Sequence, residues 1–178
     1  IGDELCIDHS MEIWGKGNVL DGYKEKYSRF ANARKHKVTV PVNCDNDLSY
    51  LFGLWMAEGS IEKKIHRLTI TCGDDVSSSL EKYGFTKCRK DQWRLNSENF
   101  VRMFEHVGMP LVRAPQKYIP EKIWNLSREQ MQYFLGGFWD GDGHSKRLRK
   151  EIGFTSSSLQ LLRDIQLVCS NFGAIGHI

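Results

Sequence analysis

The chain has 178 residues, of which 40% are hydrophobic and 26% are charged, a composition typical of a globular protein that buries a core. Its longest apolar stretches, around residues 48–57 and 133–139, are far shorter than the ~20 residues of a membrane helix, and no secretory signal opens the sequence. We therefore expect no membrane segment. The formal net charge of +3 does not by itself indicate nucleic-acid binding, because many unrelated proteins carry as much.

The five cysteines are odd in number and include no Cys-x-x-Cys pair, and the six histidines show no spacing typical of metal ligands. This pattern argues against a disulfide framework and against a zinc knuckle. We therefore predict a reduced, intracellular location, in the cytoplasm or in an organelle.

Residues 1–43 form a leader with a basic and aromatic stretch. Between residues 16 and 37 there are seven lysines or arginines against two acids, with Tyr23, Tyr27 and Phe30 interleaved. Such a stretch fits an arm that contacts DNA phosphates, and it fits a solvated helix face equally well. The alternation of residues 37–42 predicts a short strand at the end of the leader.

Residues 44–113 are expected to form a first unit, which begins with a helix capped by Asn46 or Asp47. The elements that follow are predicted from periodicity and turn residues. They are a helix end at Gly59, a half-buried strand within 64–72, a helix from 74 or 75 to Gly84, a hairpin over 85–95 and a helix from Ser97 to Val107.

Residues 114–126 read as a linker, and residues 127–178 read as a second unit. Its expected elements are a helix from Ser127 to Gly143, strand-like residues 144–155, and a helix from Ser157 or Ser158 to Gly173. The order repeats that of the first unit, which indicates an internal duplication. Because no counterpart of the first unit's hairpin and last helix follows, we expect the second half to be incomplete.

The two long helices end in the same pattern. Residues 51–59 read Leu-Phe-Gly-Leu-Trp-Met-Ala-Glu-Gly, and residues 135–143 read Leu-Gly-Gly-Phe-Trp-Asp-Gly-Asp-Gly. Each helix carries small residues four apart on one face, although an interior glycine costs a helix up to ~1 kcal/mol relative to alanine. Close packing of the two backbones is the expected compensation. The small residues at this contact are Gly53, Ala57, Gly137 and Gly141.

Two acids, Glu58 and Asp142, follow directly after these small-residue faces. If the helices pack as expected, the acids converge at two helix C-termini, where the helix dipole and the neighbouring like charge both disfavour a carboxylate. A divalent cation removes both penalties. Two carboxylates suit Mg²⁺, which supports phosphodiester hydrolysis by activating water and stabilising the leaving oxygen.

These segments resemble the two LAGLIDADG motifs, also called dodecapeptide motifs, of single-chain homing endonucleases. The family's order of helices and strands fits residues 38–178. The resemblance implies an α+β fold of two pseudo-symmetric αββαββα halves with antiparallel, saddle-shaped sheets, the second half being incomplete here. It further implies a monomeric protein that binds double-stranded DNA with a long specific target site, or a chain that needs a C-terminal part or complementing fragment.

By this resemblance Glu58 and Asp142 are catalytic, metal-binding acids, and the carbonyls of Ala57 and Gly141 complete the coordination of Mg²⁺, for which Mn²⁺ is expected to substitute. The family often carries a Lys-x-Ile-Pro segment ahead of its second motif, and residues 117–120 match it. Lys117 is therefore a candidate for polarising the scissile phosphate or the attacking water. The alternative is an exposed linker lysine.

The family's sheets lie in the DNA major groove, where each base pair shows a distinct pattern of donors and acceptors. The residues of the first half expected to face DNA are Ile65, Arg67, Thr69, Thr71, Lys87, Arg89, Gln92 and Arg94. The cations of the second half expected to contact phosphates are Lys146, Arg147, Arg149 and Lys150. For each of these residues a solvent-facing side chain is the alternative.

The best-supported function at this level is that of a metal-dependent, site-specific DNA endonuclease that cuts both strands. The same scaffold also occurs in intron RNA maturases and in transcription regulators that do not cleave, but both acids are present here, which favours cleavage. A plain helix-sheet interaction domain would leave Glu58 and Asp142 unexplained. The ends of the chain, Ile1 and Ile178, are not intein splice-junction residues, so the chain fits an endonuclease region cut from an intein as well as an intron-encoded enzyme.

Overall fold

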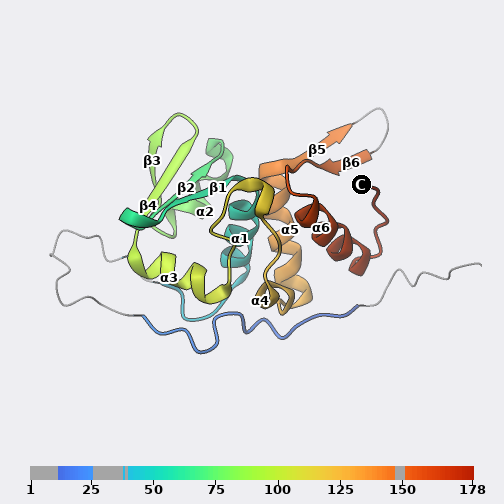
Figure 1. The fold of residues 1–178 in the computed structure, drawn as a ribbon, viewed down its shortest axis with the longest axis horizontal. Coiled ribbons are helices and arrows are strands. Elements are labelled where there is room, and N and C mark those ends of the chain that lie inside the picture. The colour runs from blue at the N-terminus through green and yellow to red at the C-terminus, as the bar shows by residue number, and fades with distance from the viewer. Residues whose placement is uncertain (1–11, 26–37, 39, 147–150) are drawn as a thin grey trace, which may run out of the picture.

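The structure is a computed structural model that describes residues 12–25, 38, 40–146 and 151–178. Two long helices, α1 (Asn46–Glu58) and α5 (Arg128–Asp142), lie side by side at the centre of the molecule. A four-stranded antiparallel sheet lies beside α1, and a two-stranded sheet lies beside α5 (Figure 1). The α+β class expected from the sequence is confirmed.

The first unit contains the full order of elements expected for one half. After α1 come β1 (Gly59–Glu62), β2 (Arg67–Thr71), α2 (Ser77–Glu81), β3 (Thr86–Arg89), β4 (Gln92–Asn96) and α3 (Glu98–Val107). Short 3-10 segments precede β2 and α2, at Lys63–Ile65 and Asp74–Val76. The strands lie in the order β1-β2-β4-β3, so β2 is an inner strand and β3 is an edge strand.

The second unit repeats the beginning of the first. A connection containing a 3-10 turn, Ala114–Gln116, and α4 (Glu121–Trp124) leads to α5, β5 (Gly143–Lys146), β6 (Glu151–Phe154) and α6 (Leu159–Asn171). The pairing of β5 with β6 repeats that of β1 with β2: Gly143↔Phe154 corresponds to Gly59↔Ile70, a shift of 84 in both partners (143 − 59 and 154 − 70). This shared register is structural support for an internal duplication.

Three helix starts were predicted correctly, whereas α2 begins at Ser77, after the 3-10 segment, and not at residue 74 or 75. Ser97, Ser127 and Ser158 cap α3, α5 and α6 as expected. The cap of α1 is Asp45, not Asn46 or Asp47, because the Asp45 carboxylate accepts the backbone N–H of Leu48 at 2.8 Å. Strand β1 was not predicted, since it begins directly where α1 ends. The predicted strand at 37–42 is wrong for residues 38 and 40–42, which lie in no strand, while residues 37 and 39 fall outside the described part.

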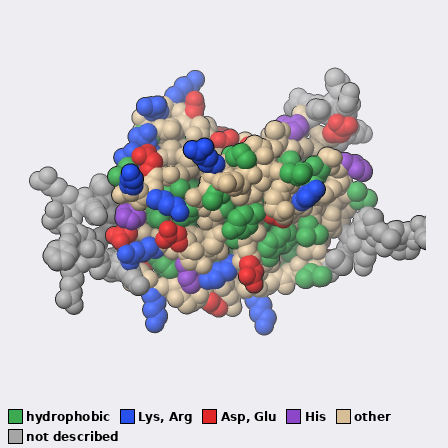
Figure 2. Space-filling model, in the orientation of Figure 1, with side chains coloured by type: hydrophobic (Ala, Val, Ile, Leu, Met, Phe, Trp, Pro, Cys, Tyr) green, Lys and Arg blue, Asp and Glu red, His purple; other side chains and the backbone are tan. Residues whose placement is uncertain are grey.

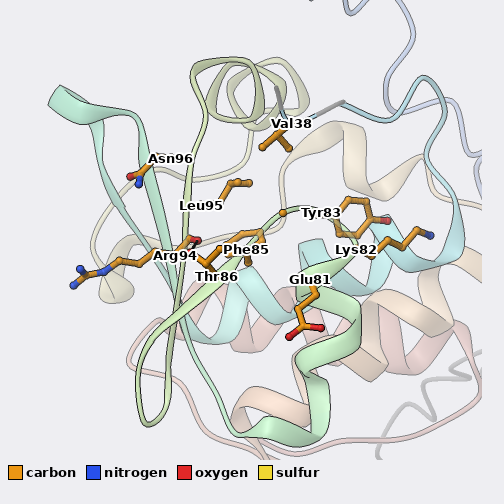
Figure 3. Close-up of a pocket in the computed structure, with 10 residues that line it drawn as sticks. Val38, Glu81, Lys82, Tyr83, Phe85, Thr86, Arg94, Leu95 and Asn96 are labelled. Carbon is orange, nitrogen blue, oxygen red and sulfur yellow. Dashed lines mark hydrogen bonds between the residues drawn. The ribbon is translucent and has the colours of Figure 1, made fainter. Parts of the chain in front are cut away.

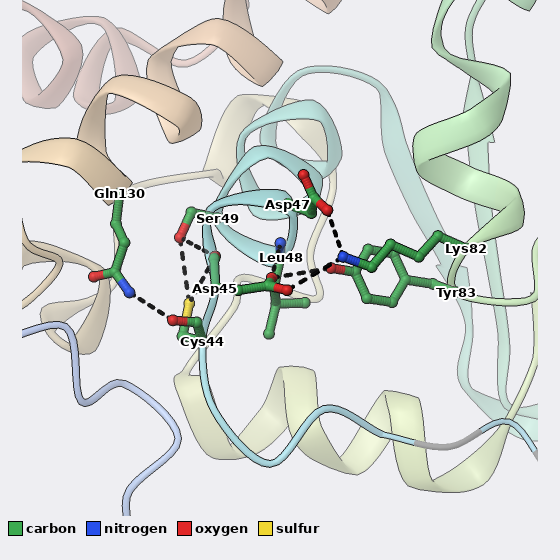
Figure 4. Close-up of polar contacts among 8 residues, drawn as sticks. All are labelled: Cys44, Asp45, Asp47, Leu48, Ser49, Lys82, Tyr83 and Gln130. Atoms are coloured by element: carbon green, nitrogen blue, oxygen red, sulfur yellow. Dashed lines mark hydrogen bonds and ion pairs between the residues drawn. The ribbon is translucent and has the colours of Figure 1, made fainter.

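The starts of α1 and α5 are joined by side-chain hydrogen bonds, one of which runs from Asn46 Nδ2 to Glu129 Oε1 at 2.7 Å. Gln130 completes a capping box at the start of α5, where its Oε1 accepts from the Ser127 backbone N–H at 2.9 Å. Its Nε2 donates to the Cys44 carbonyl at 2.6 Å, immediately before α1 (Figure 4). Asp45, next in the chain, accepts further bonds from Lys82 and Tyr83. The first turns of both helices are thereby fixed relative to each other.

The backbones of α1 and α5 touch through glycine. A Cβ placed on Gly53 would overlap the carbonyl oxygen of Phe134, and a Cβ on Gly137 would overlap the carbonyl oxygen of Tyr50. The two contacts are symmetric, since Tyr50 and Phe134 are related by the same shift of 84 (134 − 50) as the two glycines (137 − 53). The structure thus brings the backbones of α1 and α5 together at Gly53 and Gly137.

The main core lies between α1, α3 and the inner face of the four-stranded sheet. Phe104 packs edge-on against Trp55 and Phe52, with ring centroids 5.0 and 5.4 Å apart. From the sheet, fully buried Leu68 and Ile70 of β2 face the same core. The opposite face of the sheet is left polar and accessible. None of the helices in the described ranges is long and apolar enough to cross a bilayer.

Leader residues 12–25 run along the side of the molecule opposite the sheets (Figure 1). Gly15 and Gly17 donate to the carbonyls of Leu126 and Asn125 at 3.0 and 2.8 Å. The rings of Trp14 and Phe172 lie 4.5 Å apart, so the same segment also contacts the end of α6. Most of the basic stretch predicted as a DNA arm, residues 26–37, lies outside the described residues.

We predict that the same substitution, glycine to alanine, has different effects on stability at two neighbouring positions of α5. Gly137→Ala should destabilise the protein by ~1–3 kcal/mol or more, because its Cβ would meet backbone that cannot move without parting the helices. Gly136→Ala should be neutral or stabilise by up to ~1 kcal/mol, since its Cβ would lie 3.9 Å from the nearest atom, Cδ2 of Tyr50. Denaturant unfolding of the two variants measures the difference. Equal stabilities would contradict the contact.

Candidate active site

The C-termini of α1 and α5 lie together, and each presents one acid. Glu58 and Asp142 are the last residues of their helices, and both are half-buried. A Cβ on Gly141 would overlap the Ala57 Cβ and would lie 3.1 Å from the Glu58 Cγ. The structure therefore brings together four predicted residues from segments far apart in the sequence, because the small-residue contact continues to the ends of both helices.

The surroundings of the two acids disfavour their charged forms. Burial raises the pKa of Glu58, and the neighbouring negative charge of Asp142 raises it further, against the opposing effect of Lys117. Burial also raises the pKa of Asp142, again opposed by Lys117. Neither helix carries a basic residue in its last turn to offset the dipole. The pair is thus poised to gain from a bound cation.

Lys117 interacts electrostatically with both acids of this pair. It is only 4% exposed, so it is not a free linker lysine. Its ammonium donates to the backbone carbonyls of Met56, Gly59, Ala57 and Trp55 at 2.9, 3.1, 3.2 and 3.3 Å. Burial lowers its pKa, while Asp142 and Glu58 act in the opposite direction. In this structure Lys117 caps the end of α1.

The connection that carries Lys117 is itself held to α6. The Lys117 carbonyl accepts a bond from the buried Ser158 hydroxyl at 2.6 Å, and the Ile119 N–H donates to Asp164 at 2.9 Å. Ser158 also caps α6 through the N–H of Leu161. The lysine is therefore anchored from the second unit while its ammonium holds the helix of the first.

The donor set at the two helix ends fits a hard cation with oxygen ligands. Glu58 and Asp142 supply carboxylates, and the backbone carbonyls of Ala57 and Gly141 lie at the same helix ends. In the part of the chain that the structure describes, no group of three or more His, Cys, Asp or Glu residues gathers to hold a metal by itself. Mg²⁺ is commonly held by one or two carboxylates together with water and substrate phosphates, so a pair suffices.

The outer face of the four-stranded sheet carries most of the predicted DNA-contacting residues of the first half. Cross-strand pairing places Arg67 beside Asn96, Thr69 beside Arg94, and Thr71 beside Gln92. Since directly opposed residues share a face, these rows form one polar surface, which Arg89 joins through its pairing with Gln92. Figure 2 shows lysine and arginine side chains gathering over this side of the molecule.

Two of the arginines on this surface, Arg67 and Arg94, are held by neighbouring polar side chains. Arg67 Nε donates to Asn96 Oδ1 at 3.0 Å, and its Nη1 pairs with Glu62 at 3.3 Å. Arg94 Nη2 donates to Gln92 Oε1 at 2.9 Å. These contacts fix the guanidinium groups on the polar face. A base edge or a phosphate that binds these guanidinium groups would replace their hydrogen bonds to Asn96, Gln92 and Glu62.

Two of the residues expected on this face lie elsewhere, and a third, Thr69, is buried. Lys87 pairs across the strands with buried Trp93 and forms an ion pair with Asp74, so its side chain lies on the inner side; a bulge between 87 and 89 in β3 shifts the alternation. Ile65 is exposed but belongs to a 3-10 turn rather than a strand. Thr69 is on the expected face but only 7% exposed, and it lies in an inner strand beside Arg94.

The predicted cations of the second half cannot be compared in the same way. Lys146 is the last residue of β5, and nothing further is described of its side chain. Arg147, Arg149 and Lys150 lie outside the described residues.

Sequence reasoning missed four polar residues of the outer face. They are Ser60 and Glu62 on the unpredicted β1, Thr86 on β3 and Asn96 on β4, which are all exposed. The alternation of Ser60, Ile61 and Glu62 was available as a signal, but three residues directly after a helix are too few to identify a strand. Thr86 lies opposite Arg94, and Asn96 lies opposite Arg67. Both could be assigned to this face only once the register of the strands was known.

A pocket of about 580 Å³ lies at the far edge of the same sheet and is separate from the acids (Figure 3). It is lined by Val38, Glu81, Lys82, Tyr83, Gly84, Phe85, Thr86, Arg94, Leu95 and Asn96. Neither Glu58 nor Asp142 contributes to it. The candidate site is therefore the pair of helix ends together with the polar sheet face.

Part of the chain is similar to a known protein family, and most of it is similar to segments of two longer proteins. Residues 129–178 fit the family model of the LAGLIDADG-like domain. The chain is 23% identical over 181 residues to the DNA-directed RNA polymerase subunit Rpo1C of Methanocaldococcus jannaschii, covering 94% of this chain and 20% of that protein. It is 24% identical over 185 residues to the uncharacterized protein MJ1054 of the same organism, with coverages of 90% and 21%. The chain thus spans about a fifth of the length of these relatives.

The cap formed by Lys117 gives a prediction about stability. Lys117→Met should destabilise the protein by ~1–3 kcal/mol, because it leaves buried carbonyls at the end of α1 without their donor. Lys64→Met, at an exposed lysine, should change the free energy of unfolding by less than ~0.5 kcal/mol. Thermal or denaturant unfolding compares the two. A Lys117→Met variant as stable as the parent would show that the cap contributes nothing.

Proposed function

We propose that the chain is a LAGLIDADG homing endonuclease that hydrolyses both strands of double-stranded DNA at a specific site, and the match of residues 129–178 to the family model supports this. The observation that carries the proposal is the convergence of Glu58 and Asp142 at two helix ends that meet through glycine. Two carboxylates held this close at helix C-termini lower the stability of the folded protein unless they bind a cation together. A domain that only bound DNA would gain nothing from this loss of stability.

In this proposal the two carboxylates, with the carbonyls of Ala57 and Gly141, hold Mg²⁺ or Mn²⁺ between the two units. When bound, the cation supplies a Lewis acid for phosphate oxygens and lowers the pKa of water. Lys117 fixes the last turn of α1, and so it sets the direction from which Glu58 approaches the scissile phosphate. We propose this positioning role for Lys117 because its ammonium is already engaged by carbonyls.

The polar face of the four-stranded sheet is the proposed DNA-binding surface. Arg67 and Arg94 have planar groups suited to a guanine edge, and their amide partners Asn96 and Gln92 are suited to adenine. Direct base reading by such pairs would supply specificity, and exposed Arg89 would add affinity through phosphates. The protein is proposed to act as a monomer, since both acids come from one chain.

A non-cleaving DNA-binding regulator or an intron RNA maturase is the second candidate. The observation that favours it is the bond from Lys117 to the Ala57 carbonyl at 3.2 Å, because that oxygen is one of the expected metal ligands. An ammonium and a divalent cation on the same carbonyl repel each other. If Lys117 keeps this position in the DNA complex, binding without cleavage would result.

We further propose that this region lies within a longer protein, as the endonuclease region of an intein does. Support comes from the relatives, in which about a fifth of a much longer chain is similar to nearly all of this one. An endonuclease inserted in a host protein gives this relation, whereas a free-standing enzyme would match relatives of its own length.

We predict that cleavage requires a divalent metal and both acids. Incubation with a plasmid library and Mg²⁺, followed by sequencing of the cut ends, should reveal one long target site, and removal of the metal should abolish cutting. Glu58→Gln and Asp142→Asn should each abolish cleavage and leave DNA binding largely intact, because a neutral isostere removes charge and little shape. Glu105→Gln, at an exposed acid of α3, is the control. Binding with no cleavage by the parent chain would favour the regulator or maturase.

A further prediction separates base reading from phosphate binding. Arg67→Ala and Arg94→Ala should each relax the preference at particular base pairs, with a loss of ~1–3 kcal/mol of discrimination. Lys146→Ala and Lys150→Ala should weaken all sequences alike, and each should reduce the slope of log affinity against log salt by about one, because one fewer phosphate is neutralised. Binding to single-base variants of the target at several salt concentrations gives both quantities. If the two arginine variants lost the same affinity for every target sequence, Arg67 and Arg94 would not be residues that recognise bases.

A further inference from the structure

The strand that follows Asp142 carries a histidine close to the candidate site. His144 comes two residues after Asp142, and two residues of chain span at most about 7 Å. No loop separates them, because α5 ends at Asp142 and β5 begins with the next residue (Figure 1). The Asp142 carbonyl also accepts the Thr155 N–H at 3.1 Å. The imidazole is therefore attached to the same paired backbone that fixes the acid.

The register of β5 and β6 decides which face of the second sheet carries His144. Phe154 packs against Phe138 and Trp139 of α5, with ring centroids 5.4 Å apart in both pairs, so its side chain lies on the helix side. Gly153 precedes Phe154 in the strand and therefore faces the other way. His144 is the direct partner of Gly153 across the strands, so it shares the outer face.

The ring of His144 uses the space that Gly153 leaves open. A Cβ placed on Gly153 would lie 2.7 Å from Nε2 and 2.8 Å from Cε1 of His144, so the imidazole lies across β6. His144 is exposed, and within the described ranges no residue makes a hydrogen bond to its ring nitrogens. An imidazole N–H on this face is thus available to an incoming ligand.

The related position in the first sheet is different. Ser60 corresponds to His144 by the shift of 84 (144 − 60), and its partner Thr69 corresponds to Gly153 (153 − 69). Thr69 has a side chain where Gly153 has none, and a serine hydroxyl reaches less far from the backbone than an imidazole. The two units therefore present unlike groups beside their acids.

We propose that His144 donates a hydrogen bond to a phosphate oxygen of the DNA strand that lies beside Asp142, and that only the second unit makes this contact. A phosphate fits because an imidazole donates an N–H in both its neutral and its charged form, and the outer sheet face is the proposed DNA-binding surface. The inference rests on the proposed function, since it needs DNA on this face. It gives the enzyme a strand bias, because one of the two scissile phosphates is held more firmly than the other.

Cleavage of a target labelled on each strand in turn tests this bias. His144→Ala should lower the cutting rate of one strand about tenfold or more, as loss of a bond to a charged group does, and that of the other strand by less than about twofold. His144→Gln, which keeps a donor, should restore part of the rate. Ser145→Ala, at the exposed neighbour on the opposite face of β5, should leave both rates unchanged. Equal losses on both strands, or no loss on either, would overturn the proposal.

Gly153→Ala keeps the imidazole and alters only its position. Because the added Cβ would displace the ring, this variant should slow the same strand as His144→Ala does. It should have no further effect when both substitutions are combined, since the two act through one contact. Additive losses in the double variant would contradict the placement of the ring over Gly153.

A binding measurement separates failure of this contact from failure of the proposed cleavage. Duplexes selected by binding alone are made with one uncharged methylphosphonate in place of a phosphate, at each position in turn. One such replacement should lower the affinity of the parent chain but leave that of His144→Ala unchanged. This pattern in a chain that does not cut would support the contact and reject the cleavage. If every replacement affects the parent and His144→Ala alike, the contact is rejected, even in a chain that cuts.

Discussion

The contact between the backbones of α1 and α5 decides where everything else in the molecule lies. Gly53 and Gly137 leave no room for a side chain, so the helices meet at their carbonyl groups, and the small residues Ala57 and Gly141 carry the contact to the helix ends. The acids next in sequence are then forced together. Larger residues at these positions would part the helices and disperse the charge that the candidate site concentrates.

The two units are alike in the register of their backbones and differ in the bonds that their side chains make. The register of the first two strands repeats without change, but Lys117 caps only the end of α1, and Tyr50 bonds to Asp140 at 2.6 Å where the related position, Phe134, has no hydroxyl. Gln130 likewise reaches from the start of α5 to the carbonyl before α1. These bonds make the two halves inequivalent, which suits an enzyme proposed to act on an asymmetric DNA site.

Local patterns in the sequence predicted the elements whose causes are local. Serine caps, the hairpin over 85–95 and the alternation of Leu68 and Ile70 each depend on a few neighbouring residues, and each is found in the structure. The errors have non-local causes. Lys87 lies on the inner face because a bulge shifts β3, and the partner of Lys87, Asp74, stands in another element.

The sequence by itself determined that two small-residue helices carry one acid each, since spacing on a helix fixes which side chains share a face. Only the tertiary structure decided what surrounds those acids. The burial of Lys117 against four carbonyls depends on a connection held by Ser158, which is distant in sequence and unrelated by any period. The exposure of Ile152 depends likewise on the tertiary structure, because burial is a property of what packs against a residue and not of the residue.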